Sequence, residues 1–273
     1  MKPVVVIIPI YKENLTKYEW LSLKQCMMIL GNHHIIFIAP KSLSLYFYQK
    51  TTQDYNIAFN VEFFEDTYFQ GIDGYNQLML TREFYARFSE YEYMLIYQLD
   101  AYVFRDELLD WCALGYDFIG APSVGNWSDN DFSYNLVVGN GGFSLRKIKT
   151  YITAFDLNRN LLSAREIIKQ YAVFKKIWTR IPLLLLMQFG FRNKLYYFAS
   201  TWKYTEDDFW SKFLSSTNYS LTKPIPEKAL EFAFERFPSN LFKITKKLPF
   251  GCHGWYKYEY EEFWKKHINE ENK

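Results

Sequence analysis

An acidic residue stands just after an apolar strand near the middle of the chain. The strand is expected at 94–97, and Gln98 and Asp100 follow it before a second short apolar run begins. Ligands of open α/β sheets gather outside the carboxyl ends of the strands. The Asp100 carboxylate is therefore a candidate ligand for a metal ion and a diphosphate group. Aspartate also caps turns, and the spacing alone leaves both interpretations open.

Two other expected strands end in residues that suit a nucleotide. Pro9 ends the first strand and Tyr11 follows it, where an aromatic ring can pack on a base. Glu65 and Asp66 follow the third strand, and their carboxylates suit the N–H edge of a uracil or the hydroxyls of a ribose. A strand-ending proline with a surface loop, and a solvated acidic turn, are the alternatives.

Three glycines surround an asparagine at 139–142. Glycine next to an apolar strand marks a bulge or a close approach of the backbone to a ligand. We therefore expect Asn140, Gly141 and Gly142 to hold sugar hydroxyls. An Asn-Gly pair is also a strong signal for a tight hairpin.

An acidic cluster at 205–208 could supply a general base. Glu206 and Asp207 stand beside aromatic residues, and one of these carboxylates could take the proton of an acceptor hydroxyl. Alternatively, Thr205 caps a helix whose amino end favours negative charge, which explains the cluster without catalysis.

A histidine lies between two glycines near the carboxyl end. These small neighbours leave the imidazole of His253 approachable, and a neutral imidazole is a common metal ligand. Trp255 follows and is a candidate contact for a sugar. In an extended chain Cys252 points to the opposite face. A lone histidine is more often structural.

The first hundred residues alternate between strand and helix patterns. Such alternation predicts an α/β fold with a Rossmann-like, mostly parallel central sheet flanked by helices. The expected strands are 4–9, 34–39, 60–64 and 94–97, and the expected helices are 15–30, 43–53 and 75–88.

Composition narrows the class of protein. The chain has 273 residues, of which 21% are aromatic, and its net charge of +2 gives no argument for nucleic-acid binding. The three cysteines are scattered without metal-ligand spacing and are expected to be reduced. The apolar run at the amino terminus is too short for a secretory signal, and no segment reaches the roughly 18 apolar residues of a spanning helix. We expect a cytoplasmic protein.

A different pattern follows a polar loop at 125–135. Residues 157–203 have a helical pattern and contain a Leu-rich stretch at 181–191, which is too short to span a bilayer. This segment could bind an anionic membrane surface, or it could be an ordinary helical subdomain with a buried Leu stripe. Its basic residues, set against the single acid Glu166, are Arg159, Arg165, Lys169, Lys175, Lys176, Arg180, Arg192, Lys194 and Lys203.

The ordered motifs IPIYKE, IYQLDAYVF, YDFIGAP, VGNGGFSLRK, EDDFW and FGCHGWYK together resemble a family of bacterial GT-A glycosyltransferases, often found in polysaccharide loci. Many of its members are described only as domains of unknown function. The resemblance covers roughly 3–150 and 200–260. It implies one GT-A domain over 1–273 with a helical insertion at 151–203.

The resemblance also implies roles for single residues. Asp100 stands where the DxD carboxylate binds the metal and the donor diphosphate, His253 where a histidine binds the same metal, and Asp207 where inverting members keep the general base. Position 98 departs from the pattern, because Gln98 offers a neutral oxygen to the expected Mn²⁺ or Mg²⁺.

These observations predict a glycosyltransferase that moves a sugar, with inversion, from a UDP-sugar donor to a hydroxyl of a glycan or a lipid-linked glycan. The alternative from a different class is a catalytically silent module that binds nucleotide sugars or glycans and keeps the same fold.

Overall fold

The computed structural model describes residues 1–123, 137–171, 181–217 and 219–268. The polar loop expected at 125–135 lies outside the described residues, as do Lys175, Lys176 and Arg180 of the basic segment.

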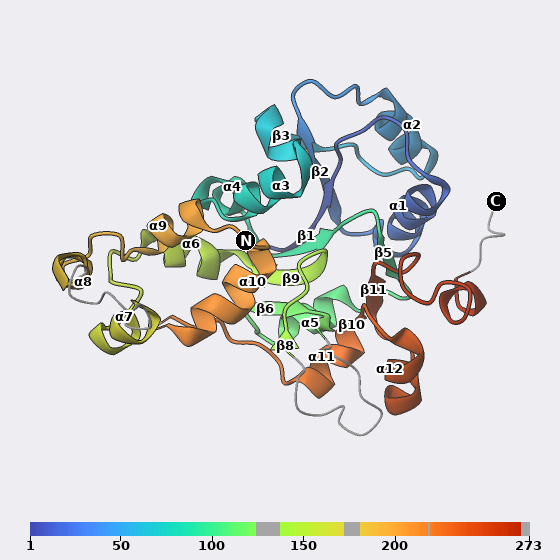
Figure 1. The fold of residues 1–273 in the computed structure, drawn as a ribbon. Helices are drawn as coiled ribbons and strands as arrows, with labels where there is room; N and C mark the ends of the chain where they lie inside the picture. The colour runs from blue at the N-terminus through green and yellow to red at the C-terminus, as the bar shows by residue number, and fades with distance from the viewer. Residues whose placement is uncertain (124–136, 172–180, 218, 269–273) are drawn as a thin grey trace.

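A six-stranded sheet in the order β3-β2-β1-β4-β9-β6 forms the centre of the molecule (Figure 1). Strands β3, β2, β1 and β4 are parallel, and β9 runs antiparallel to both of its neighbours. The expected mostly parallel α/β sheet is thus confirmed. Its strands are β1 (Lys2–Pro9), β2 (His34–Pro40), β3 (Val61–Phe64), β4 (Tyr91–Tyr97), β6 (Phe118–Gly120) and β9 (Phe143–Lys147).

Both faces of the sheet are buried, because successive side chains of a strand point to opposite faces. In β1, Val5 and Ile7 belong to one hydrophobic core, and Val4, Val6 and Ile8 belong to the other. Burial on two sides explains the continuous apolar runs of these strands. The helices are α1 (Lys17–Leu30), α2 (Tyr46–Asp54), α3 (Gly71–Met79), α4 (Arg82–Arg87), α5 (Leu108–Ala113), α6 (Ile148–Asp156), α7 (Ala164–Tyr171), α8 (Ile181–Gln188), α9 (Leu195–Thr201), α10 (Glu206–Asp208), α11 (Pro226–Phe232) and α12 (Pro238–Thr245).

A small second sheet joins the carboxyl-terminal part of the chain to the end of β4. Its order is β10 (Ala233–Phe234), β11 (Gly251–His253) and β5 (Ala101–Val103). Strand β11 runs antiparallel to β5, with His253 opposite Ala101. This register brings the histidine next to Asp100. A short hairpin of β7 (Pro122–Ser123) and β8 (Val137–Val138) completes the strands of the described residues.

One expected helix is divided in two. The apolar spacing predicts a helix over 75–88, whereas α3 ends at Met79 and α4 begins at Arg82. Thr81 has extended backbone angles, and its hydroxyl accepts the N–H of Phe84 at 3.2 Å. A threonine in this role starts a new helix, which the apolar spacing does not reveal.

Helices α6 to α9 follow β9 and extend the molecule to one side, with α7 and α8 at its far end (Figure 1). Leu162, Ile167, Met187 and Phe198 of this region are buried in the same hydrophobic core as one face of the sheet. The expected helical character of this basic segment is therefore present in its described residues.

Candidate functional site

A cleft of about 590 Å³ lies at the edge of the central sheet where β1 and β4 end. Its volume is within the range of small-molecule sites. Because β9 is antiparallel to β4, the turn that precedes β9 lies at the same edge. The cleft is lined by Pro9, Tyr11, Glu19, Tyr68, Phe69, Gly71, Ile72, Tyr75, Asn76, Gln98, Leu99, Asp100, Asn140, Gly141, Gly142, Thr205, Glu206, Asp207, Glu235, His253, Tyr256 and Lys257.

Asp100 lies between two cationic side chains. Its Oδ1 is 3.1 Å from His253 Nε2, and its Oδ2 accepts a hydrogen bond from Lys257 Nζ at 2.6 Å. Asp100 lies within a tight turn that is closed by the Ala101 N–H, which donates to the Gln98 carbonyl at 2.8 Å. Burial raises the pKa of Asp100, but His253 and Lys257 outweigh this effect and lower the pKa below its usual range. The carboxylate is therefore ionised.

His253 contacts a second carboxylate through its other ring nitrogen. Nδ1 lies 3.2 Å from Glu235 Oε1, and Asn140 Nδ2 donates to the same oxygen at 3.0 Å. Burial lowers the pKa of the imidazole, but the carboxylates of Asp100 and Glu235 have the larger, opposite effect and raise the pKa to about 10. His253 is thus a partly buried cation held between two carboxylates.

Gly141 and Gly142 join the two halves of the cleft. A methyl group on Gly142 would collide with His253 Nε2, and one on Gly141 would collide with Glu206 Oε1. The backbone therefore packs directly against the imidazole of His253 and the carboxylate of Glu206. Asn140 keeps this turn closed, because its Oδ1 accepts the Gly142 N–H at 3.0 Å.

Glu206 forms a buried, bidentate ion pair with Arg146. Its Oε1 and Oε2 accept from Arg146 Nη2 at 2.6 Å and from Nη1 at 2.9 Å. Arg146 also donates to Tyr85 and Ser144. Burial raises the pKa of Glu206 while Arg146 opposes the rise, and the pKa of Arg146 is raised well above its usual value. Both oxygens of Glu206 are thus occupied by Arg146, which leaves this carboxylate poorly placed for the proton transfer expected from the sequence.

Asp207 differs from the other acidic residues of the cleft. Glu19 pairs with Lys12, Glu206 with Arg146, and Asp100 and Glu235 with His253. Within the described ranges, no ion pair is found for Asp207. Burial raises the pKa of its carboxyl group, and the neighbouring Asp208 adds to the rise. A partly desolvated carboxylate without a cationic partner is a suitable proton acceptor.

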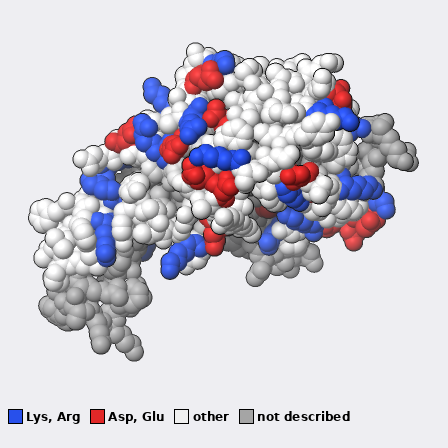
Figure 2. Space-filling model, turned by 90° about the horizontal axis from the view of Figure 1, so that it is seen from above, with Lys and Arg blue, Asp and Glu red and all other residues white. Residues whose placement is uncertain are grey.

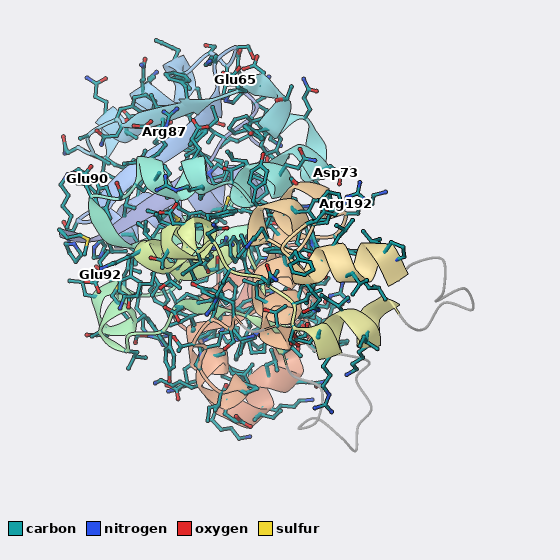
Figure 3. All side chains as sticks on the ribbon, turned by 90° about the vertical axis from the view of Figure 1, so that its left-hand side faces the viewer. Glu65, Asp73, Arg87, Glu90, Glu92 and Arg192 are labelled. Carbon is teal, nitrogen blue, oxygen red and sulfur yellow. The ribbon has the colours of Figure 1, made fainter. Side chains whose placement is uncertain are left out.

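Three predicted ligand contacts lie away from the cleft. Glu65 pairs with Lys41 on the surface, and Asp66 accepts the Ser42 N–H; neither residue lines the cleft. Figure 3 shows Glu65 at the outer edge of the molecule. Trp255 is fully buried against Tyr18 and other aromatic rings, so a sugar cannot reach it. The sequence shows that these residues are polar or aromatic, but it does not show whether their side chains are buried or which way they point.

Several residues of the cleft were not expected from the sequence. Glu235 and Lys257 contact the predicted pair of Asp100 and His253. The ring of Tyr256 lines the cleft and stacks on Tyr18 with ring centroids 5.0 Å apart. The hydroxyl of Tyr75 is buried in the cleft wall without a hydrogen-bond partner in the described residues. Tyr256 and Lys257 are the last two residues of the FGCHGWYK motif, and this was the available signal for them.

The arrangement of donors does not suit the expected divalent metal ion. Asp100 and Glu235 contact opposite nitrogens of the His253 ring, so the three groups do not converge on one point. The Lys257 ammonium group already occupies the second oxygen of Asp100. In the described part of the chain, no group of three or more His, Cys, Asp and Glu side chains is placed to hold a metal ion.

Comparison with known proteins identifies one family. The profile described as "Protein of unknown function (DUF5672)" matches residues 58–253, which include the site from Gln98 to His253. No curated protein matches the chain.

Two of the matching solved structures are only distantly similar. The crystal structure of S. aureus TarS shares 14% identity at a TM-score of 0.37, over 56% of this chain and 30% of that one. The crystal structure of A197 from STIV shares 12% identity at a TM-score of 0.31, over 60% of this chain and 73% of that one.

Replacing Glu206 with Gln should destabilise the protein by about 3–5 kcal/mol, because the buried Arg146 charge then loses its partner. The matched control is Asp208→Asn, which removes a carboxylate from the same turn. Asp208 pairs with Lys212 on the surface, so this change should cost less than about 1 kcal/mol. Urea unfolding of both variants measures the difference. Equal midpoints and slopes would contradict the assigned role of the buried pair.

Proposed function

The chain belongs to the DUF5672 family, and we propose that it is a glycosyltransferase with a GT-A type of fold. It would transfer a sugar from a nucleotide-sugar donor, UDP-linked, to a hydroxyl of a glycan or a lipid-linked glycan. One observation carries this proposal. One cleft at the carboxyl edge of the sheet contains Asp207, a carboxylate with no ion pair among the described residues, and a cluster of cations around Asp100. The turn of Gly141 and Gly142 connects the two.

The donor diphosphate would be bound by protein cations. Lys257 carries three N–H donors, of which Asp100 takes one, so two remain for phosphate oxygens. Its side chain is about half exposed, which leaves the ammonium group accessible from the cleft. Charge that develops on the leaving diphosphate would be stabilised by this group. Asp100 and His253 would act as positioning residues for Lys257 and for the turn at Gly142. This replaces the metal ion expected from the sequence.

The nucleotide would lie toward β1. Tyr11 and Tyr256 line that part of the cleft and offer aromatic faces for a base. Tyr75 carries a buried hydroxyl without a partner in the described residues, and such a group is costly unless a ligand completes its hydrogen bond.

The reaction would be a single displacement. The acceptor oxygen forms a bond to the anomeric carbon while the bond from that carbon to the diphosphate oxygen breaks. Asp207 takes the proton of the acceptor hydroxyl, and the nucleoside diphosphate leaves with the bonding electron pair. Attack from the side opposite the leaving group inverts the configuration of the anomeric carbon.

Replacing Asp207 with Asn should reduce the rate of transfer by about 10²–10⁴-fold, because the base is lost. Donor affinity, measured by calorimetry, should remain unchanged, since the diphosphate is proposed to bind at Lys257 and not at Asp207. Asp208→Asn is the control and should retain activity. A fully active Asp207→Asn variant would refute the base. Donor binding by the unmodified chain without turnover, across a broad acceptor panel, would favour the silent binding module instead.

The pH dependence of kcat/KM should carry the signature of Asp207. The base must be ionised, so activity is lost as the pH falls through its pKa, which burial raises above 3.8. The Asp208 charge contributes to this rise. The acid limb should therefore move to lower pH in the Asp208→Asn variant. A limb that stays in place would show that another group controls the rate.

Donor binding should persist in EDTA and without added Mn²⁺. Lys257→Ala should weaken UDP-sugar binding about tenfold or more, because a charge-assisted hydrogen bond to phosphate is lost. Lys265→Ala is the matched control, since Lys265 pairs with Glu261 on the surface of the same segment. Calorimetric titration measures both. If donor binding requires Mn²⁺ and is unchanged in Lys257→Ala, a metal ion and not Lys257 binds the diphosphate.

A further inference from the structure

Helix α8 exposes an apolar face at the far end of the molecule. Pro182, Leu185, Leu186 and Phe189 are all exposed and are spaced i, i+3, i+4 and i+7, which places them on one side of a helical turn. The exposed fractions are 57% for Leu185, 50% for Leu186 and 88% for Phe189. Isolated exposed apolar residues are common, but a contiguous exposed apolar patch marks an interaction surface.

The opposite side of α8 is anchored to the protein. Met187 is buried in the core of the main sheet, and Leu183 and Leu184 pack against that core. Helix α8 is therefore apolar on all sides, and the core covers only part of it. A helix of this kind normally has a second apolar environment.

A fixed turn presents the exposed residues. The side chain of Asn193 is fully buried; its Oδ1 accepts the Leu162 N–H at 2.8 Å, and its Nδ2 donates to the Leu162 and Met187 carbonyls at 2.9 and 3.0 Å. Gly190 has a φ of +93°, a conformation that glycine adopts readily. These hydrogen bonds hold the polypeptide after α8 in place, and Phe189 in this turn is exposed to solvent.

Positively charged side chains lie beside this face, on α7 and after α8. Residues 157–203 contain nine Lys and Arg residues and one acid, Glu166. Arg165, Lys169 and Arg192 are exposed among the described residues. Figure 2 shows Lys and Arg side chains over the described surface of this end, and Figure 3 shows Arg192 next to α8. An occupant of the face must therefore carry negative charge next to apolar groups.

A second copy of this chain fits this requirement poorly, because it would bring two positively charged surfaces together. The exposed face also consists of few side chains, whereas stable dimers bury about 1,200–2,000 Å². A bilayer with anionic headgroups offers both acyl chains and negative charge. Helix α8 has eight residues and is about 12 Å long, and no helix in the described parts of the chain is long and apolar enough to cross a membrane.

We propose that the exposed face of α8, together with Phe189 and the cations Arg165, Lys169 and Arg192, binds the surface of an anionic lipid bilayer. The helix lies in the plane of the interface with its apolar face among the upper acyl chains and the cations among the headgroups. The proposal holds whether or not the cleft transfers a sugar, because its readout is lipid binding.

Flotation of the full chain with vesicles tests the proposal. The protein should float with vesicles of phosphatidylcholine and phosphatidylglycerol, remain unbound with phosphatidylcholine alone, and dissociate as salt is raised. The triple variant Leu185→Gln, Leu186→Gln and Phe189→Gln should bind at least tenfold more weakly. The charge variant Lys169→Glu and Arg192→Glu should lose binding to the anionic vesicles.

A matched control distinguishes binding through this surface from non-specific binding of exposed apolar residues to lipid. Leu109→Gln and Leu114→Gln change exposed leucines of α5 and of the turn that follows it, and this double variant should float as the unmodified chain does. Circular dichroism confirms that each variant is folded. The proposal fails if the unmodified chain does not float, or if the triple variant floats equally well. A concentration-dependent dimer that the triple variant abolishes would also overturn it, in favour of a second copy.

Discussion

The bidentate ion pair between Arg146 and Glu206 lies beneath the cleft, and the arrangement of the site depends on it. Arg146 comes from a strand of the central sheet and Glu206 from the short helix that carries Asp207. The two charges are removed from water, which is costly, and their close geometry with the hydrogen bonds to Tyr85 and Ser144 offsets that cost. Gly141 packs against Glu206 because it has no side chain. One buried contact thus sets the distance between the backbone turn and the proposed base.

The other carboxylates of the cleft follow a common rule, in that each is neutralised by a nearby cation. Asp100 is balanced by His253 and Lys257, and Glu235 by the other side of the same imidazole. This pairing keeps His253 and Lys257 charged in a partly buried cleft, where they could interact with a diphosphate. It also explains why these acids do not converge on one metal ion. Asp207 departs from the rule among the described residues, and a carboxylate that no cation neutralises is free to accept a proton.

The end of the molecule formed by α7 and α8 obeys a different constraint. Helix α8 has apolar residues on all sides, and the core of the sheet covers only one of these sides. Asn193 holds the helix end in place through buried hydrogen bonds to the backbone. An apolar face with cations beside it is suited to a surface that combines acyl chains with negative charge. The cleft and this surface are built from separate residues, so each can be altered without the other.

The sequence by itself determined the sheet and much of the cleft. The apolar runs of β1, β2 and β4 require burial on both faces, and polar residues that follow parallel strands must meet at one edge, so Asp100 and the turn at Gly141 were predictable. The two-residue glycine turn also indicated a close approach of the backbone. Only the tertiary structure decided which acidic residues are neutralised and which aromatic rings are buried. Lys257 reaches Asp100 and Arg146 reaches Glu206 across long stretches of chain, and Trp255 is buried because a neighbouring element covers it. Such contacts depend on how distant segments are aligned with one another, and local residue patterns do not predict that alignment.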